Sequence, residues 1–269
     1  MNNLTGLIDA DFIKYLVAYD IEKMYKGGLK PDVQIPLKTV DALIEKRLRQ
    51  ITNNTHPNAK NHFFLFSGKT KDNYRAQIAC VKKYKGTRVY NEKFPKEGEY
   101  RSYVETYIAN NYPYWKENDL EADDLCVMGH HNGTFIYSND KDLKMSPGIH
   151  YDLKLKMFTR TTIDEGFRIL MTQTLSGDGV DNIAGVDGVG PTIGGRIVDK
   201  YKTEDEVIQA VIQVYTHKYG YKLGLDRFTE MYTLVNLKTE RGEWTKEKYS
   251  GFFNKLEELK KDGENDFYI

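Results

Sequence analysis

The sequence predicts an α/β fold in which a mostly parallel sheet is flanked by helices and a helical C-terminal portion follows. Two observations support this prediction. Up to about residue 160, short apolar runs alternate with amphipathic helical patterns, as strands and helices do in parallel sheets. From about Thr162 to Lys261, nearly every segment has a helical pattern, and Gly-rich turns separate the segments.

The periodicity of apolar residues places each element along the chain. Buried strands are expected at residues 4–8, 62–66 and 134–137, with a hairpin at the sheet edge over 149–159. Helices are expected at 12–24, 40–51 and 100–112, from Glu121 onward, and in the basic segment after Lys69. That last helix would place Lys85 and Arg88, three residues apart, on one face. Residues 89–98 are expected to form a loop.

The composition is that of an ordinary globular chain. Its 269 residues are 40% hydrophobic with a mean hydropathy of −0.62, which excludes disorder across the whole chain. We expect no membrane-spanning helix and no signal peptide, because no apolar stretch has the required length or flanks. Cys80 and Cys126 stand far apart without metal-ligand spacing. They exclude a disulfide scaffold or thiolate zinc site and favour a reducing cytoplasm.

Charge is balanced overall but unevenly distributed. The 39 Lys and Arg cancel 39 Asp and Glu, which argues against simple electrostatic binding of nucleic acid. Residues 69–88, however, hold seven basic residues against the single Asp72. Acidic residues gather in four clusters at residues 9–11, 121–124, 140–142 and 178–181. Each cluster alone is explained by helix capping or by the helix dipole.

Together, the acidic clusters indicate metal chemistry. Three of the four follow a predicted strand or begin the next helix, so the fold would bring them together. Carboxylates this close repel unless cations neutralise them, and oxygen-only ligands select Mg²⁺ or Mn²⁺ over zinc. Two such ions about 4 Å apart are a common device for phosphodiester hydrolysis. The candidate ligands are Asp9, Glu121, Asp123, Asp124, Asp140, Asp142, Asp178 and Asp181.

A glycine-rich segment at residues 183–197 reads as a turn joining two helices. Its glycines allow a close approach of the backbone to phosphate, and Pro191 suits the first turn of the following helix. Exposed amides at that helix start would hold a DNA phosphate without reading sequence. A plain tight turn is the alternative. A dinucleotide site at Gly188 and Gly190 is less favoured because no strand precedes them.

The order of these motifs resembles the 5′-nuclease (flap endonuclease) family, most closely its compact phage 5′→3′ exonucleases and phage RNase H. The resemblance covers about residues 4–200 and lies in an ordered series of motifs. The matching segments are Asp9, Tyr84-Lys85-Gly86-Thr87-Arg88, Glu121-Ala122-Asp123-Asp124, Asp140-x-Asp142, Gly177-Asp178-x-x-Asp181-Asn182 and the glycine turn.

This resemblance implies a PIN-like α/β core at residues 1–160, with a short arch or clamp at about 89–118. It implies a helical region at 161–269 with a helix–three-turn–helix at about 176–200. Aromatic side chains in or near the arch could stack on bases or belong to the core, and helical spacing favours the core. They are Phe94, Tyr100, Tyr103 and Tyr107.

The resemblance also implies a role for individual residues. The first of two or more Mg²⁺ ions, which Mn²⁺ could replace, would be held by Asp9, Glu121, Asp123, Asp124 and Asp140. The second would be held by Asp142, Asp178 and Asp181. Lys85 and Arg88 would contact the scissile phosphate, and Arg75 would contact phosphate or shape the gateway. The DNA-binding residues would be Gly185, Gly188, Val189, Gly190, Thr192, Lys69 and Lys71, with K⁺ at the glycine turn.

One position departs from the family pattern. Where relatives carry an Asp after the second strand, this chain has Phe66-Ser67-Gly68. Ser67 supplies no carboxylate, so the first metal site would lack a ligand unless Asp11 replaces it.

The acidic clusters predict metal-dependent phosphoryl chemistry, and the resemblance implies a divalent-metal-dependent 5′→3′ exonuclease or flap endonuclease. Its partners would be DNA with a 5′ end, flap or nick, and RNA–DNA hybrids as an RNase H would use. We expect a monomer without a membrane partner, acting in phage replication, repair or recombination in the cytoplasm, the host's if the chain is phage-encoded. Two alternatives stay open: a PIN-like ribonuclease for single-stranded RNA, and a catalytically weakened DNA-junction-binding protein, which Ser67 favours.

Overall fold

A six-stranded sheet forms the centre of the chain. The computed structural model describes residues 4–55 and 61–237, together with residues 247, 250, 251, 254 and 258. The strands are β1 (Thr5–Asp9), β2 (His62–Phe66), β3 (Tyr114–Lys116), β4 (Thr134–Tyr137), β5 (Gly148–Asp152) and β6 (Met157–Thr161). They lie in the order β3-β2-β1-β4-β5-β6, and each neighbouring pair is parallel except β5 with β6. The predicted α/β class with a mostly parallel sheet is confirmed.

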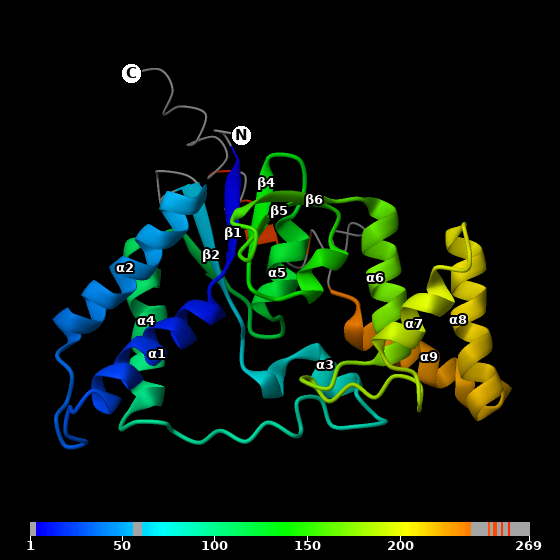
Figure 1. Cartoon of the computed structure of the whole chain (residues 1–269), viewed down its shortest axis with the longest axis horizontal. Helices are drawn as coiled ribbons and strands as arrows, with labels where there is room; N and C mark the ends of the chain where they lie inside the picture. The colour runs from blue at the N-terminus through cyan, green and yellow to red at the C-terminus, as the bar shows by residue number, and fades with distance from the viewer. Residues whose placement is uncertain are drawn as a thin grey trace.

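Helices cover both faces of the sheet (Figure 1). Those that precede the last strand are α1 (Asp11–Lys26), α2 (Leu37–Thr55), η2 (Thr70–Asp72), α3 (Tyr74–Ile78), α4 (Glu97–Asn111), α5 (Ala122–Gly129) and η3 (Asp142–Met145). Ile8 and Phe64 point to the α1, α2 and α4 side, whereas Leu7 and Phe63 pack towards α5 on the other side. This alternation buries both faces, which is why the central strands are apolar almost throughout.

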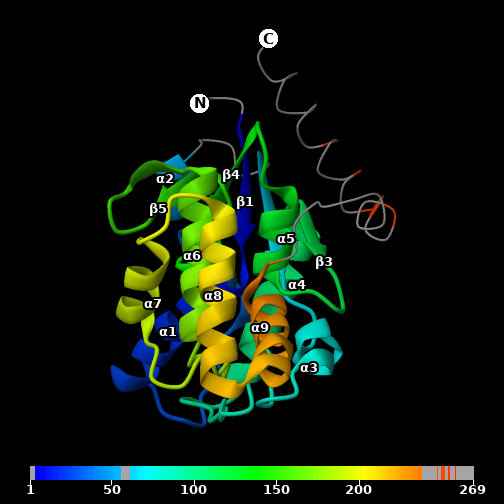
Figure 2. The same cartoon turned by 90° about the vertical axis from the view of Figure 1, so that its right-hand side faces the viewer.

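After β6, the described chain is mainly helical. It comprises α6 (Ile163–Ser176), α7 (Pro191–Val198), α8 (Glu204–Tyr219) and α9 (Tyr221–Val235), which share a separate apolar core. In α6, the N-cap Thr162 and Glu165 form a capping box that fixes the helix start. Figure 2 shows α8 and α9 in front of the sheet, with α7 beside them. Part of the predicted helical region, residues 238–246, lies outside the described residues.

The structure differs from the sequence-based expectation in two elements. β3 was not predicted, because it has three residues, of which two are exposed, and so short a segment shows no alternation. The predicted basic helix ends at Ile78, and an irregular loop over residues 79–96 follows; in Figure 1 it runs along the lower edge from α3 to α4. α4 itself packs on α1 and α2 and belongs to the core.

The four aromatic side chains that the sequence placed in or near the arch are held in or against the core. Phe94 and Tyr100 are buried. Tyr103 and Tyr107 are partly buried and donate their hydroxyls to Asp41 and Glu45 of α2, both at 2.7–2.8 Å. The core alternative for these four residues is confirmed. Among the described helices, none is long and apolar enough to cross a membrane.

Candidate active site

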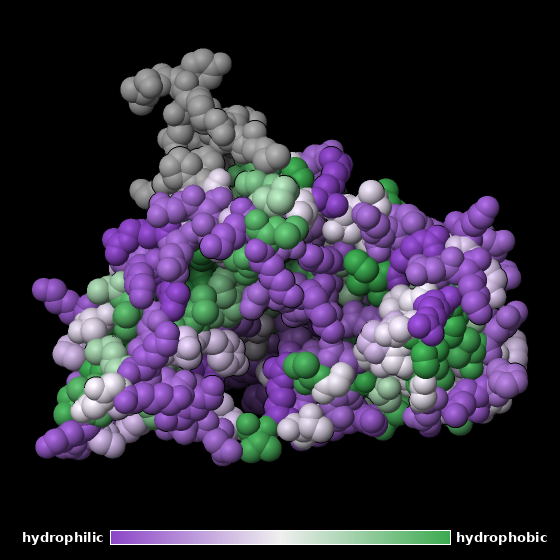
Figure 3. All heavy atoms as spheres, in the orientation of Figure 1, coloured by the Kyte–Doolittle hydropathy of each residue, from purple (hydrophilic) through white to green (hydrophobic). Residues whose placement is uncertain are grey.

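A cleft of about 620 Å³ opens at the carboxyl ends of the central strands. β1 has β2 on one side and β4 on the other, so the chain reverses direction across the sheet at this point, where open α/β sheets bind ligands. Figure 3 shows the molecule hollowed between the half that contains the sheet, β1 to β6, and the helical half, α6 to α9. The acidic residues that line the cleft are Asp9, Asp11, Glu121, Asp123, Asp140, Asp142, Asp178 and Asp181. The basic ones are Lys14, Lys85, Arg88, Arg101 and Lys141.

Asp9 lies at the end of β1 and is held from two sides. Its Oδ2 accepts a hydrogen bond from Ser138 Oγ at 2.8 Å, and its Oδ1 accepts one from the Asp11 amide at 3.2 Å. Burial, reinforced by the nearby Asp11 charge, raises the pKa of Asp9 to about 7. The ionised form of Asp9 is thus disfavoured in the absence of a cation.

Ser67 and Asp11 occupy the region where the family pattern has an additional Asp. Ser67 Oγ accepts a hydrogen bond from the Ala122 amide at 2.9 Å, at the start of α5. The Ser67 amide in turn donates to Asp11 Oδ2 at 3.3 Å, and Lys14 Nζ lies 2.5 Å from Asp11 Oδ1. A carboxylate is therefore present beside Ser67, although α1 provides it.

Glu121 and Asp123 lie at the start of α5. Glu121 is buried, and its two oxygens contact the Lys85 ammonium and, at 2.6 Å, the Tyr84 hydroxyl. Burial and the adjacent charges of Asp124 and Glu121 raise the pKa of Asp123 well above its usual range. This end of α5 thus concentrates negative charge with only partial compensation.

The third and fourth acidic clusters face each other across the cleft. Asp140 and Asp142 follow β4, whereas Asp178 and Asp181 follow α6. Burial, and then the charge of Asp140 and a hydrogen bond with Asp178, raise the pKa of Asp142 to about 7. Burial would also raise the pKa of Asp178, but hydrogen bonds from Asp142 and from the Val180 and Asp181 amides outweigh it and lower that pKa. In the absence of a cation, Asp142 therefore keeps its proton to a higher pH than Asp178 does.

Lys85 and Arg88 reach the cleft on a turn and not on a helix, so the predicted helical face is wrong. Lys85 has a left-handed backbone (φ 52°), and its amide donates to the Asp181 carbonyl at 2.8 Å. Its ammonium pairs with Glu121 and lies 3.6 Å from Asp181 Oδ2. Arg88 Nη2 contacts Asp181 Oδ1 at 2.6 Å. The basic turn is thus anchored on the loop after α6, which places both cations among the carboxylates.

Two predicted site residues lie outside the cleft. Arg75 and Asp124 are 2% and 0% exposed, and they form a bidentate ion pair with N–O distances of 2.6 and 2.8 Å. Their burial contradicts a direct contact of Arg75 with phosphate and of Asp124 with a metal ion. Both residues instead connect α3, α5 and the end of α9.

The glycine turn joins α6 to α7 and is exposed in part. Gly185 is buried, and a Cβ there would lie 2.4 Å from the Gly177 nitrogen, so Gly185 serves packing and cannot contact DNA as predicted. Gly188 (φ 87°) and Gly190 are exposed with open space around them, and Thr192 is exposed in the first turn of α7. Val189 is half-buried against the helical core. Lys69 and Lys71 are exposed and flank Thr70, which lines the cleft.

No protein-family model matches the chain. T5 5′-exonuclease with bound divalent zinc ions is 14% identical, with a TM-score of 0.56 over 98% of this chain and 99% of that one. The T5 D15 protein co-crystallised with metal ions is also 14% identical, with a TM-score of 0.55 over 97% and 98% of the two chains. The chain has the fold of T5 5′-exonuclease.

A sequence match adds to this result. DNA polymerase I of Rhizobium leguminosarum is 27% identical over 121 residues, which cover 39% of this chain and 12% of the polymerase. The match therefore spans about an eighth of that much longer protein. The resemblance to 5′-nucleases expected from the motifs is confirmed at the level of the fold.

Within this 5′-exonuclease fold, the cleft suits divalent cations by its donor chemistry. Eight carboxylates face five cationic side chains, and burial disfavours ionisation of Asp9, Asp123 and Asp142. Within residues 4–55 and 61–237, no three acidic, His or Cys side chains lie close enough to enclose an ion directly.

Sequence reasoning assigned no role to Tyr84, which lies behind the cleft wall, or to Arg101. Tyr84 is buried, and its hydroxyl lies 2.6 Å from Glu121 Oε2 and 2.8 Å from Asp181 Oδ2, so it bridges the second and fourth acidic clusters. Its position next to Lys85 was the available signal. Arg101 of α4 lines the cleft, but no sequence motif marks it.

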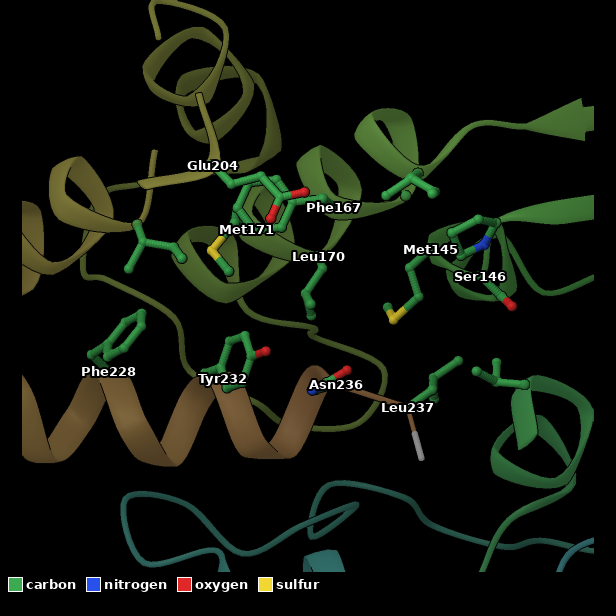
Figure 4. Close-up of a pocket in the computed structure, with 15 residues that line it drawn as sticks. Met145, Ser146, Phe167, Leu170, Met171, Glu204, Phe228, Tyr232, Asn236 and Leu237 are labelled. Atoms are coloured by element: carbon green, nitrogen blue, oxygen red, sulfur yellow. The ribbon is translucent and has the colours of Figure 1, made fainter. Parts of the chain in front are cut away.

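A second cavity, of about 400 Å³, lies between α6, α9 and η3 (Figure 4). Its walls are mainly apolar, with Met145, Leu170 and Phe228 among them, and Glu204 is the charged residue among those that line it. It contains no arrangement suited to phosphoryl chemistry. The 620 Å³ cleft is therefore the candidate active site.

Proposed function

We propose that this chain is a divalent-metal-dependent nuclease that hydrolyses phosphodiesters near 5′ ends of DNA, as a 5′→3′ exonuclease or flap endonuclease. The observation that carries the proposal is the cleft itself. Four acidic clusters meet the basic turn of Lys85 and Arg88 there, at the switch point of a 5′-exonuclease fold.

The cofactor in this proposal is Mg²⁺, as two or more ions that Mn²⁺ can replace. Bound there, the ions would activate a water and neutralise charge on the scissile phosphate. We assign one site to Asp9, Glu121, Asp123 and Asp140, with Asp11 near the missing family Asp. We assign the other to Asp142, Asp178 and Asp181. Asp124 is left out because its carboxylate is committed to Arg75.

Lys85 and Arg88 are the proposed phosphate ligands. Both pair with carboxylates assigned to the metal sites, Glu121 and Asp181. A metal ion bound by those carboxylates would displace the Lys85 and Arg88 side chains from them. The two side chains would then be free to contact phosphate. Arg can hold two phosphate oxygens at once, whereas Lys acts as a point charge.

The glycine turn is the proposed grip on the duplex. Gly188, Gly190 and Thr192 present an open backbone at the start of α7, where amides can hold a phosphate or, through carbonyls, a K⁺ ion. Lys69 and Lys71 would add charge at the cleft rim. Because backbone contacts read no bases, binding would be independent of sequence.

The proposal extends to setting and substrate range. The T5 and DNA polymerase I matches favour a role in DNA replication, repair or recombination. We propose that the protein acts as a monomer in the cytoplasm, the host's if it is phage-encoded. RNA in RNA–DNA hybrids is a second substrate to test. Asp11 beside Ser67 favours an active enzyme over a junction-binding protein.

Substrate choice tests this function. The full chain is incubated with Mg²⁺ and 5′-labelled substrates: a 5′-flap duplex, a nicked duplex, an RNA–DNA hybrid and single-stranded RNA. We expect cleavage of the first two near the 5′ end, and none in EDTA. Cleavage of single-stranded RNA alone would instead establish the ribonuclease alternative, and tight flap binding without turnover would establish the junction-binding one.

A further inference from the structure

The turn that carries Lys85 has a backbone conformation that needs support from outside the turn. The Gly86 amide donates to the Lys83 carbonyl at 2.9 Å, which closes a tight turn over residues 83–86. Lys85 is the third residue of this turn, and its backbone is left-handed (φ 52°). A residue with a Cβ rarely adopts this conformation, which Gly, Asn and Asp adopt most readily. Contacts with the rest of the protein must therefore hold Lys85 in place.

The loop after α6 provides two such contacts, both to the backbone of the turn. The Asn182 side-chain amide, Nδ2, donates to the Lys83 carbonyl at 2.8 Å. The Lys85 amide donates to the Asp181 carbonyl at 2.8 Å. The two segments are almost a hundred residues apart in the sequence, but the loop after α6 lies beside the segment that follows α3 (Figure 1). Two adjacent residues of the loop thus hold the turn on either side of the buried Tyr84.

The charged side chains of the turn cannot hold it during the proposed reaction. In this structure the Lys85 ammonium pairs with Glu121, and Arg88 pairs with Asp181. Both ion pairs end when the two side chains leave these carboxylates to contact phosphate. The hydrogen bonds from the Asn182 side chain and to the Asp181 carbonyl involve no carboxylate, so they remain. The position of Lys85 at the phosphate then depends on these two hydrogen bonds.

A purely local role for Asn182 is the alternative. Its own backbone is left-handed (φ 60°), a conformation that asparagine tolerates better than most residues. On this alternative, the side-chain contact with Lys83 is incidental. A glycine at this position separates the two roles, because glycine adopts the same backbone conformation but has no side-chain amide.

We propose that Asn182 is a positioning residue for cleavage, which holds the turn so that the Lys85 ammonium meets the scissile phosphate. The inference rests on the proposed function and deepens it. Asn182 does not line the cleft, so it acts through Lys85 and not on the phosphate itself. The loop that carries Asn182 is closed by two backbone hydrogen bonds between Asp178 and Ile183, at 2.7 and 3.0 Å. Asn182 thus attaches the turn to a loop whose own conformation is fixed.

Single-turnover cleavage of a 5′ flap at saturating enzyme tests the proposal. Asn182→Gly should slow cleavage about tenfold, the factor that corresponds to the loss of one hydrogen bond. Asn111→Gly is the matched control, because the Asn111 side chain also donates to a backbone carbonyl at 2.8 Å but does not line the cleft. When Asn182→Gly is added to Lys85→Ala, cleavage should slow further by about threefold or less, because the positioned group is absent.

Hydrogen exchange provides a readout that does not depend on cleavage. The backbone of residues 79–88 should exchange faster in Asn182→Gly than in wild type or Asn111→Gly, at an unchanged free energy of unfolding in urea. Unchanged exchange, unchanged cleavage, or an equal loss of rate in the Lys85→Ala background would each overturn the proposal. If wild type cleaves nothing, the proposed function fails, and the exchange rates still show whether Asn182 holds the turn.

Discussion

Arg75 and Asp124 form a bidentate ion pair that is almost completely buried, with N–O distances of 2.6 and 2.8 Å. Arg75 Nε also donates to the Leu234 carbonyl at 2.8 Å, near the end of α9. Asp124 Oδ2 accepts the Glu121 amide at 3.2 Å. One arginine thus connects the helical half to the N-terminus of α5, where Glu121 and Asp123 begin one side of the cleft.

Loss of one member of this pair should destabilise the protein. Arg75→Met leaves the Asp124 carboxylate buried without its partner, which typically costs about 3–5 kcal/mol. Urea unfolding should show this decrease in the free energy of unfolding. Arg75→Met with Asp124→Leu should recover much of it, since no isolated charge is left buried. Unchanged stability of Arg75→Met together with weaker DNA binding would instead support a phosphate contact.

Lys85 and Arg88 should be needed for cleavage more than for binding. We expect Lys85→Ala and Arg88→Ala each to slow single-turnover cleavage of a 5′ flap roughly a hundredfold or more, about 3 kcal/mol. Binding of DNA in Ca²⁺ should change far less, since one phosphate contact among many is lost. The exposed Lys82→Ala is the control. If each variant loses DNA affinity by as large a factor as it loses cleavage rate, Lys85 and Arg88 are ordinary contacts to the DNA backbone.

The pairing of Lys85 with Glu121 also predicts how Lys85→Ala changes metal affinity, and this change is opposite in direction to the change in cleavage. Lys85 places a positive charge among carboxylates that would hold cations. Its removal should therefore strengthen divalent binding severalfold in calorimetric titrations with Ca²⁺, even as cleavage falls. Weaker Ca²⁺ binding in Lys85→Ala would show that Glu121 and Asp181 do not serve the metal.

The metal-free protein should lose stability as pH rises towards 8. The pKa of Asp9 is raised to about 7 in the folded state, above its unfolded value of 3.8, chiefly by burial. Between these values the folded state holds a proton that the unfolded state has lost, so stability falls by up to about 1.4 kcal/mol per pH unit. Below pH 4 this contribution is complete, and above pH 7 it is lost.

Melting temperatures in EDTA and in Mg²⁺ check this dependence. The difference between wild type and Asp9→Asn isolates Asp9 from His130 and His150, whose lowered pKa values give the opposite dependence on pH. Asp9→Asn should be the more stable protein in EDTA at pH 8, and Mg²⁺ should stabilise wild type more than the variant. If the difference in stability between wild type and Asp9→Asn does not change between pH 5 and pH 8, the raised pKa of Asp9 is contradicted.

The glycine turn offers a matched pair of substitutions. Gly190 has an extended backbone (φ −87°, ψ 175°) and open space around it, so Gly190→Val should fold normally. Its side chain should block the approach of a phosphate and weaken duplex binding equally for different DNA sequences. Gly185→Val should instead destabilise the fold, because Cβ would meet backbone atoms at 2.4 Å. A loss of binding by Gly190→Val that varies with DNA sequence would contradict a backbone grip.

The elements that the sequence predicted well are those whose local pattern matches their tertiary setting. β2 and β4 were predicted to the residue, because each is buried on both faces and is apolar after its first residue. Seven of the eight proposed carboxylate ligands line the cleft, because they follow β1, β4 and α6 or begin α5. In a parallel sheet the carboxyl ends of the strands and the starts of the following helices lie at the same edge. The alternation of strand and helix patterns along the sequence already indicates such a sheet.

The errors have physical causes that no local pattern encodes. Asp124 looked equivalent to its neighbour Asp123, but helix rotation turns it inward to Arg75. Lys85 and Arg88 have helical spacing, yet the Lys85 amide bonds to the Asp181 carbonyl, almost a hundred residues away, and fixes a turn. Arg101 belongs to no motif, since only the packing of α4 on α1 brings it to Tyr15.

The central claim is that the carboxylates of this cleft support metal-dependent cleavage, and Asp142→Ala tests it most directly. Cleavage of a 5′-labelled flap duplex in Mg²⁺ is compared for wild type, Asp142→Ala and the exposed control Asp205→Ala. We expect wild type and Asp205→Ala to cleave near the 5′ end, and Asp142→Ala to be inactive while binding the duplex in Ca²⁺ at least as tightly. Activity of Asp142→Ala near the wild-type rate would contradict the account.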